Sequence, residues 1–154
     1  MRVTTRYTHS DFDRVLEISN QCYAENERPT AVDLRNMISV SDVFLLTLDT
    51  GVALESQSDI IGFAIVKNVD APYLWSLAVD PRYQRCYHGT QLLHEVISHY
   101  ARAGEKEISL HVNVYNGAQK MYFDHGFHAV EVVKNYYPGA DALYMKRIYR
   151  RQYD

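Results

Sequence analysis

The sequence of 154 residues predicts an α/β fold whose elements follow the order βααβββαβαββ. Short runs rich in branched and aromatic residues, such as Tyr73 to Val79, have the composition of strands. Other stretches repeat apolar residues at i, i+3 and i+4, which is the spacing of one helix face. Proline and glycine separate these segments. At Asp80-Pro81 the proline ends a strand, because it lacks an N–H and restricts the residue before it.

The first part of the chain predicts a short strand and two helices. Arg2 to Thr8 has the composition of a short strand. Ser10 is a suitable N-cap for a first helix, and apolar residues at helical spacing follow from Phe12 to Ile18. Thr30 is a suitable N-cap for a second, shorter helix that turns Leu34 inward.

Three strands then precede the longest helix. Val43 to Leu48 and Asp59 to Val69 are apolar runs, separated by a small, polar loop from Asp49 to Ser58. Tyr73 to Val79 is the third strand. From Gly89 onward, apolar residues recur at helical spacing at Leu92, Leu93, Val96, Ile97, Tyr100 and Ala101.

The last part predicts three strands and one short helix. Gly104 suits the C-cap of the preceding helix. Ile108 to Val114 alternates, which puts His111 on the face opposite to the apolar residues. A short helix begins at Asn116 or Gly117 and ends at Gly126. The final two strands, around the turn Pro138-Gly139, are Phe127 to Tyr136 and Ala142 to Ile148.

Composition predicts one globular domain over residues 1–154. Hydrophobic residues make up 47% and charged residues 23%, and the formal net charge of -3 argues against nucleic acid as a partner. No apolar run approaches a membrane span and the first residues do not resemble a signal peptide, so no membrane contact is expected. Two cysteines, Cys22 and Cys86, make no disulfide framework, which favours a cytoplasmic protein. The spacings of the seven histidines fit no metal-ligand pattern, so no metal site is predicted.

One loop has the character of an anion site. Gln84-Arg-Cys-Tyr-His-Gly-Thr90 connects the strand ending at Val79 to the longest helix. Such a loop can aim several backbone N–H groups at one point, and the helix N-terminus adds partial positive charge. A pyrophosphate is the expected ligand of this loop, and Arg85 would add a full positive charge to the site. An ordinary strand-to-helix turn explains a lone glycine equally well, so the loop alone does not decide.

The stretch Arg82-Tyr-Gln-Arg-Cys-Tyr-His-Gly-Thr-Gln-Leu-Leu93 resembles the acetyl-CoA-binding segment of GNAT acetyltransferases, which usually reads Gln/Arg-x-x-Gly-x-Gly/Ala. It departs from that pattern at Tyr87, where the family usually has glycine. Asn116-Gly-Ala-Gln-Lys-Met-Tyr-Phe-Asp-His-Gly-Phe127 resembles the second signature of the same family. The element order also fits the GNAT fold, which implies a mixed central sheet flanked by helices.

Two further segments are similar to protein N-terminal acetyltransferases, which implies a protein or peptide N-terminus as acceptor. They are Leu110-His-Val-Asn-Val-Tyr-Asn116 and Lys134-Asn-Tyr-Tyr-Pro138. In one group of these enzymes a strand tyrosine and a strand histidine are the catalytic pair, and Tyr73 and His111 fall on those positions. His111 would be the general base, because imidazole titrates near neutral pH. Tyr122 would stabilise the leaving thiolate by a proton or a hydrogen bond.

The resemblance implies that acetyl-CoA is the co-substrate and that it lies along the strand end, the loop and the short helix. Backbone N–H groups at the strand end would hold the oxyanion of the tetrahedral intermediate. The expected cofactor contacts are Leu77, Ala78, Val79, Gln84, Arg85, Cys86, Tyr87, His88, Gly89, Thr90, Asn116 and Tyr122. The expected acceptor contacts are Tyr23, Glu25, Trp75, Tyr136 and Tyr137. The acids Glu25 and Glu27 suit a cationic amine.

Each assignment has an alternative that the sequence leaves open. His111 fits a core histidine, Tyr73 is one of 13 tyrosines, and Tyr136 with Tyr137 fits the packing of a hairpin. A small amine, such as a polyamine or a drug, is the alternative acceptor, and an oligomer or an auxiliary subunit is compatible with the sequence. Tyr87 motivates a third reading, a non-catalytic acyl-CoA-binding module. We expect Tyr87 to keep a negative φ and to turn its ring outward, so that acetyl-CoA still binds.

Overall fold

The computed structural model describes residues 1–48, 59–84 and 87–150. The strands are β1 (Arg2–Thr4), β2 (Ser41–Thr47), β3 (Ile60–Asn68), β4 (Pro72–Val79), β5 (Glu107–Asn113), β6 (His128–Tyr137) and β7 (Ala140–Ile148). The helices are α1 (Phe12–Cys22), α2 (Ala31–Ser39), α3 (His88–Arg102) and α4 (Gln119–Asp124). Leaving aside the short 3₁₀ turns, the predicted order βααβββαβαββ is confirmed.

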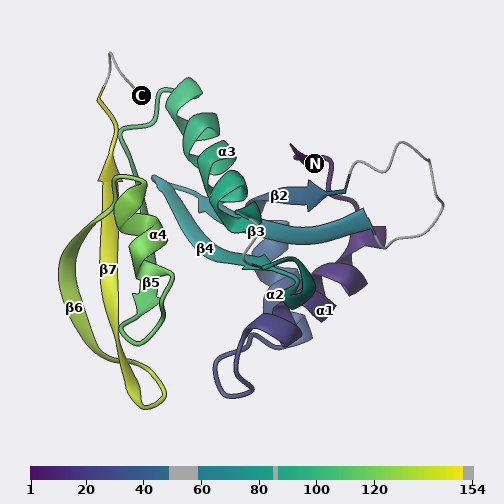
Figure 1. The fold of residues 1–154 in the computed structure, drawn as a ribbon, viewed down its shortest axis with the longest axis horizontal. Coiled ribbons are helices and arrows are strands. Elements are labelled where there is room, and N and C mark those ends of the chain that lie inside the picture. Colours follow the sequence, from purple (N-terminus) through teal and green to yellow (C-terminus); the bar gives the residue numbers. More distant parts are fainter. Residues whose placement is uncertain (49–58, 85–86, 151–154) are drawn as a thin grey trace.

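One mixed sheet organises these elements (Figure 1). Its seven strands lie in the order β1-β2-β3-β4-β5-β7-β6. The pair β4–β5 is parallel, and every other neighbouring pair is antiparallel. The chain reaches β5 from β4 through α3, as a parallel connection requires. The sheet therefore consists of two antiparallel groups, β1 to β4 and β5-β7-β6, joined by a single parallel pair.

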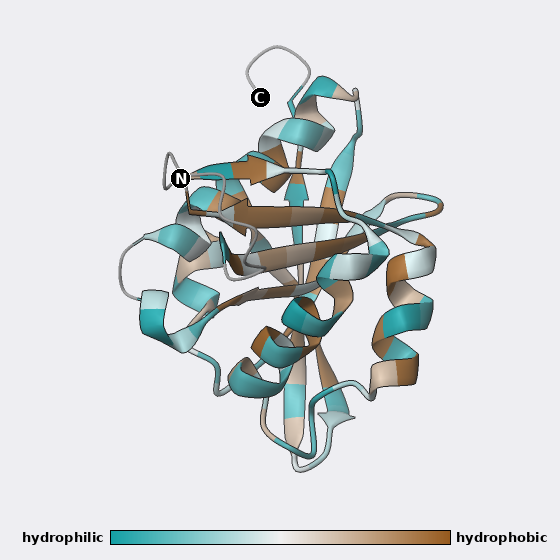
Figure 2. Ribbon diagram, turned by 90° about the vertical axis from the view of Figure 1, so that its right-hand side faces the viewer, coloured by the Kyte–Doolittle hydropathy of each residue, from teal (hydrophilic) through white to brown (hydrophobic). Residues whose placement is uncertain are grey.

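Helices cover both faces of the sheet and enclose two separate cores (Figure 1). On one face the apolar stripe of α3, including Leu92, Val96 and Tyr100, packs with Tyr122 of α4 against β2 to β5 and β7. On the other face Phe12, Val15 and Ile18 of α1 pack with α2 against β2, β3 and β4. Figure 2 shows mostly hydrophobic central strands, with helices beside them that carry both hydrophilic and hydrophobic residues.

Several element boundaries differ from the prediction at the start of the chain. The first strand is shorter than Arg2 to Thr8, since it ends at Thr4. Ser10 is not an N-cap but lies within a 3₁₀ turn over His9–Asp11. The Asp11 carboxylate accepts a hydrogen bond from the Thr8 N–H at 2.9 Å. This contact, rather than Ser10, caps the start of the helical segment. The Thr30 cap is confirmed, because its hydroxyl accepts from the Asp33 N–H at 3.1 Å.

Other boundaries move by a few residues. The α3 stripe is confirmed, although the helix begins at His88 and Ala101 is only partly buried. The short helix begins at Gln119 rather than at Asn116 or Gly117, because the Asn116 side chain accepts from the Ala118 N–H at 2.8 Å and forms a turn. The predicted loop from Asp49 to Ser58 lies outside the described residues.

Glycine ends both helices on the α3/α4 face, as predicted. Gly104 has φ +77° and follows α3, and Gly126 has φ +87° and follows α4. Such positive φ values are strained for residues with a Cβ, so glycine closes these helices without cost. The chain then turns directly into β5 and β6, the strands that border the site described below.

A buried ion pair ties α1 to the end of β4. Asp80 is fully buried, and its Oδ2 atom lies 2.7 Å from Arg14 Nη2 and 2.8 Å from Arg82 Nη2. The Arg14 Nε–H donates to the Ile60 carbonyl at 2.9 Å, so its buried guanidinium is shared between β3 and Asp80. The two guanidinium groups hold the pKa of Asp80 well below its usual range. This pair fixes the point at which the chain leaves β4 for the loop before α3.

No helix in the described ranges is both long and apolar enough to cross a membrane.

Candidate active site

The site begins where β4 and β5 separate. These parallel strands pair only at Tyr73↔Ser109 and Leu74↔Leu110, although both continue beyond that point. On its other edge β4 carries a bulge, because Ser76 faces Ile65 and Leu74 faces Val66, which leaves Trp75 without a partner on β3. Beyond Leu74 the backbone of β4 therefore has no strand partner on the side toward β5, and N–H groups along this edge can serve a ligand.

A cavity of about 1270 Å³ fills this split and runs from the α1–α2 loop to the start of α3. Among the described residues, every expected site residue except one lines this cavity: Tyr23, Tyr73, Trp75, Leu77, Ala78, Val79, Gln84, Tyr87, His88, Gly89, Thr90, His111, Asn116, Tyr122, Tyr136 and Tyr137. The exception is Glu25, which is exposed outside it. Arg85 and Cys86 lie outside the described residues.

Tyr73 and His111 form a hydrogen-bonded pair across the two strands. The Tyr73 hydroxyl lies 2.6 Å from His111 Nδ1 and 3.5 Å from the Tyr136 hydroxyl. Their positions follow from the register, since Tyr73 faces Ser109 and His111 is two residues further along β5 on the same face. Either group can donate in this contact, so the pair can pass a proton along it.

Aromatic rings surround His111. Its ring stacks on Tyr136 at 4.4 Å between centroids and on Tyr144 at 4.8 Å, and the Tyr137 hydroxyl donates to the His111 carbonyl at 3.4 Å. Burial lowers the pKa of His111, while the charge of Glu131 raises it. Burial raises the pKa of Tyr73. At neutral pH the pair is therefore an uncharged imidazole beside a protonated phenol.

Tyr122 reaches the cavity from the other side of the sheet. It is 8% exposed, and its ring packs edge-on against Phe127 at 5.7 Å. Burial raises the pKa of Tyr122, so its hydroxyl stays protonated. None of the residues described in the structure forms a hydrogen bond with this hydroxyl, which leaves its proton available to a ligand.

At the opposite end of the cavity, the loop before α3 is anchored to β4. The Gln84 side-chain N–H donates to the Val79 carbonyl at 2.9 Å, and the Cys22 thiol donates to the same carbonyl at 3.1 Å. The side-chain amide of Gln84 is thus engaged within the protein. Gly89 and Thr90, in the first turn of α3, present the N–H groups that the sequence predicted for an anion.

Tyr87 differs from its predicted conformation. Its φ is 62°, in the left-handed region, so the expected negative φ is wrong. The outward orientation is confirmed, because the side chain is 83% exposed. The backbone at this position thus adopts the conformation that a glycine would take, and the ring leaves the cavity open.

Replacing Tyr87 by glycine is expected to raise the free energy of unfolding by up to about 1 kcal/mol. A non-glycine residue in the left-handed region costs roughly 1–2 kcal/mol, part of which is offset by the greater chain entropy of glycine. The affinity for acetyl-CoA should change by no more than about tenfold, roughly 1.4 kcal/mol. Urea unfolding and calorimetric titration measure the two quantities. Binding gained only by the glycine variant would mean that Tyr87 closes the site.

The α1–α2 loop forms the end of the cavity at which the acceptor contacts were expected. The Tyr23 hydroxyl is 2.8 Å from the Ser76 hydroxyl of β4, and Asn113 Nδ2 of β5 donates to Glu27 Oε1 at 3.0 Å. The loop is therefore fastened to both sides of the split. Glu27 lines the cavity, whereas Glu25 does not, and Asp33 of α2 is a second acid in the lining.

Sequence reasoning did not select Asn113 or the cavity residues around α2. Asn113 lies on the same face of β5 as His111, two residues further on, so the strand alternation could have indicated it. Arg28, Asn36 and Met37 also line the cavity. No local pattern separates these three from ordinary loop and helix residues, because their role depends on how α2 lies across the split.

Known proteins that resemble this chain were found by sequence and by structure. The model of the acetyltransferase (GNAT) family matches residues 12–127. The [ribosomal protein bS18]-alanine N-acetyltransferase of Haemophilus influenzae is 38% identical over 86 residues, which cover 55% of this chain and 59% of the relative. The chain thus spans only about three fifths of the length of that curated relative (59%).

Solved structures of acetyltransferases are similar to this chain over nearly its whole length. The crystal structure of the ribosomal-protein-S18-alanine N-acetyltransferase from Escherichia coli superposes with a TM-score of 0.83 at 25% identity, over 96% of this chain and 92% of that one. A chain of the NatC complex bound to Gag peptide and CoA superposes with a TM-score of 0.81 at 18% identity, over 97% and 98%, which shows a shared fold. With the family match over residues 12–127 and the split sheet described above, this chain belongs to the acetyltransferase (GNAT) family.

Proposed function

We propose that this chain transfers the acetyl group of acetyl-CoA to the α-amino group of a protein or peptide N-terminus. Acetyl-CoA is the acetyl donor of the family. The observation that carries the proposal is the Tyr73–His111 pair, 2.6 Å apart, in the cavity where β4 and β5 separate. It places a neutral imidazole beside the free edge of β4, where a thioester can be held.

The amine must lose a proton in this reaction. An α-amino group has a pKa of roughly 8, against about 10.4 for a lysine side chain, so an N-terminus needs only a weak base. The neutral His111 imidazole accepts that proton as the amine nitrogen attacks the thioester carbonyl. The developing oxyanion meets N–H groups of β4 near Leu77. The C–S bond then breaks, and the Tyr122 hydroxyl donates a hydrogen bond that stabilises the departing thiolate.

The position of the hydrogen on His111 determines the route of the proton. If Nδ1 carries it and donates to the Tyr73 hydroxyl, Nε2 is free to accept from the amine directly or through water. If Tyr73 donates to Nδ1 instead, the amine proton passes to Tyr73 as the phenol proton moves to His111. We favour the direct route, because burial raises the pKa of Tyr73 and disfavours even a transient phenolate.

The acceptor lies between the α1–α2 loop and the β6–β7 hairpin. Tyr136 is half-exposed and stacks on His111, so a peptide that reaches the imidazole must pass this ring. The relatives from Haemophilus influenzae and Escherichia coli are alanine N-acetyltransferases of a ribosomal protein. We include an N-terminal alanine as the first acceptor residue to test. A ribosomal acceptor would place the reaction in the cytoplasm.

A peptide panel tests the proposal. Purified protein with acetyl-CoA is expected to acetylate peptides with a free N-terminal alanine, and mass spectrometry locates the acetyl group on the α-nitrogen. The matched control is the same peptide with a blocked N-terminus and an internal lysine, which should remain unmodified. Turnover of spermidine in place of the peptides would identify a small-amine acetyltransferase. Binding of CoA without turnover of any amine would identify a non-catalytic module.

A further inference from the structure

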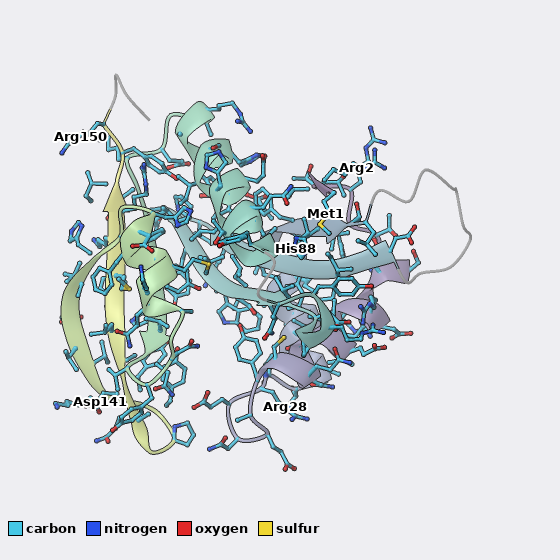
Figure 3. The ribbon with its side chains drawn as sticks, viewed as in Figure 1. Met1, Arg2, Arg28, His88, Asp141 and Arg150 are labelled. Carbon is cyan, nitrogen blue, oxygen red and sulfur yellow. The ribbon has the colours of Figure 1, made fainter. Side chains whose placement is uncertain are left out.

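A tyrosine outside the cavity contacts the imidazole of His111. His111 of β5 lies directly opposite Tyr144 of β7, and their rings stack at 4.8 Å between centroids with an angle of 30° between the planes. Tyr136, which also stacks on His111, lines the cavity, whereas Tyr144 does not. Figure 3 labels Asp141 near the start of β7 and Arg150 beyond its end, and Tyr144 lies between them along the strand. Tyr144 therefore contacts the imidazole without lining the space that a ligand would fill.

The His111 imidazole is enclosed between two aromatic rings. The Tyr136 ring lies 4.4 Å from the imidazole and nearly parallel to it, at an angle of 5°. Both tyrosines belong to the described part of the chain, and they make no ring contact with each other. Two rings stacked on the same face of an imidazole would touch. Tyr136 and Tyr144 therefore lie on opposite faces of the His111 ring.

One edge of the imidazole is held as well. Among the described residues, the Tyr73 hydroxyl is the only hydrogen-bond partner of the His111 side chain, and it contacts Nδ1 at 2.6 Å. The Tyr137 hydroxyl donates to the backbone carbonyl of His111 at 3.4 Å. Both faces and the Nδ1 edge of the ring are thus in contact with protein, and the Nε2 edge is left for the amine.

We propose that Tyr144 is a positioning residue for the acetyl transfer, which holds the His111 imidazole against Tyr136 and stabilises the imidazolium formed when His111 accepts the amine proton. The proton moves from the amine nitrogen to Nε2, and no bond of Tyr144 is made or broken. The positive charge that appears on the imidazole then lies between two π-systems, whose negative faces attract it. This inference rests on the proposed function, because it requires His111 to be the general base.

Substitution of Tyr144 separates the ring from the hydroxyl group. Tyr144→Leu keeps an apolar side chain on β7 but removes the aromatic face, and we expect kcat with an N-terminal peptide to fall by about tenfold. The KM for the peptide and the affinity for CoA should change by less than about twofold, because Tyr144 lines no part of the cavity. Tyr144→Phe restores the ring without the hydroxyl and should return kcat to within about twofold of the parent value.

A double-mutant cycle distinguishes positioning of the base from general damage to the fold. If Tyr144 acts only through the imidazole, Tyr144→Leu should lower kcat no further in the His111→Ala background. Tyr144→Ile is the second variant, because branched residues suit strands. The matched control is Tyr115→Leu, since Tyr115 is 84% exposed and lies outside the cavity, and it should leave kcat unchanged.

The pKa of His111, measured by NMR in the absence of substrate, gives a second test. Loss of the aromatic face destabilises the imidazolium, so this pKa should be lower in Tyr144→Leu than in Tyr144→Phe by about half a unit. A loosened site that admits water would raise the pKa instead, because burial is what lowers it. The other titratable and charged groups around His111 are kept in both variants: Tyr73, Glu131, Tyr136, Tyr137, Glu27 and the ion pair of Lys146 with Glu107.

Three results would overturn the role of Tyr144. They are a leucine variant with the kcat of the parent chain, the same loss of kcat with and without His111, and a His111 pKa that is equal or higher in the leucine variant. In each case the parent chain still acetylates the peptide, so the proposed function stands. A parent chain that acetylates no amine would overturn the proposed function instead, while the NMR comparison still shows whether Tyr144 stabilises the imidazolium.

Discussion

Replacing His111 by alanine is expected to lower kcat by about a hundredfold or more, while CoA binding stays nearly unchanged. The imidazole is the only group hydrogen-bonded to Tyr73 within 3 Å among the described residues, and it faces the cavity rather than a core cluster. Its loss removes the acceptor for the amine proton but no contact with the cofactor loop. Steady-state kinetics with an N-terminal peptide and calorimetry with CoA separate the two effects.

The pH profile distinguishes a base from a structural histidine. Because burial lowers the pKa of His111, the acidic limb of kcat/KM should lie below pH 6.5, the ordinary value for imidazole. In the alanine variant this limb should vanish and leave the ionisation of the amine itself. His128→Ala, on an exposed position, serves as the control. Wild-type turnover by the His111 variant across the pH range would restore the core-histidine interpretation.

Replacing Asp80 by asparagine should reduce the free energy of unfolding by about 3–5 kcal/mol at pH 7. The change removes the buried counter-charge of the Arg14 guanidinium, which is 8% exposed, and leaves it paired only with the exposed Glu17 at 2.7 Å. It also frees Arg82 and the chain that leaves β4. Urea unfolding measures the loss. The control is Asp124→Asn, which breaks a largely exposed pair with Lys120 and should cost less than about 0.5 kcal/mol.

Acid should reduce the difference in unfolding free energy between the Asp80→Asn variant and the parent chain. A carboxylate whose pKa is lowered in the folded state contributes stability above its unfolded pKa, about 3.9 for Asp, and loses it as the pH falls toward the lower folded value. The stability gap between the parent and the Asp80 variant should therefore be complete at pH 7 and should shrink below about pH 4. A gap of the same size at pH 3 would show that packing, rather than charge, causes it.

The sequence was sufficient where a local pattern determines the structure. The α3 stripe, the alternation that places His111 opposite the apolar residues of β5, and the glycines after α3 and α4 were all predicted correctly. These features depend on neighbours within a few residues. Loop ends were less predictable, because capping contacts such as Thr8 with Asp11 compete with other polar residues nearby.

Long-range contacts were beyond the reach of such patterns. Arg14 and Asp80 are 66 residues apart, and Glu27 and Asn113 are 86 apart, so no window along the chain contains either pair. The prediction of a negative φ at Tyr87 was wrong for a different reason. Residue preferences favour a negative φ for tyrosine, but the geometry of the turn into α3 requires a positive one, and the turn prevails over the preference.

The brief pairing of β4 with β5 has a mechanical consequence. Only two residue pairs connect β4 with β5, so few backbone hydrogen bonds hold the two halves of the seven-stranded sheet together. An extended molecule with amide groups that lies in the gap beyond Leu74 would form hydrogen bonds with the unpaired strand edges. The sheet would then be continuous from β4 to β5. The pantetheine arm of acetyl-CoA has this form. The co-substrate would then act as a borrowed strand, and at a hundredfold excess over its Kd it would add about 2.7 kcal/mol to the stability of the whole fold.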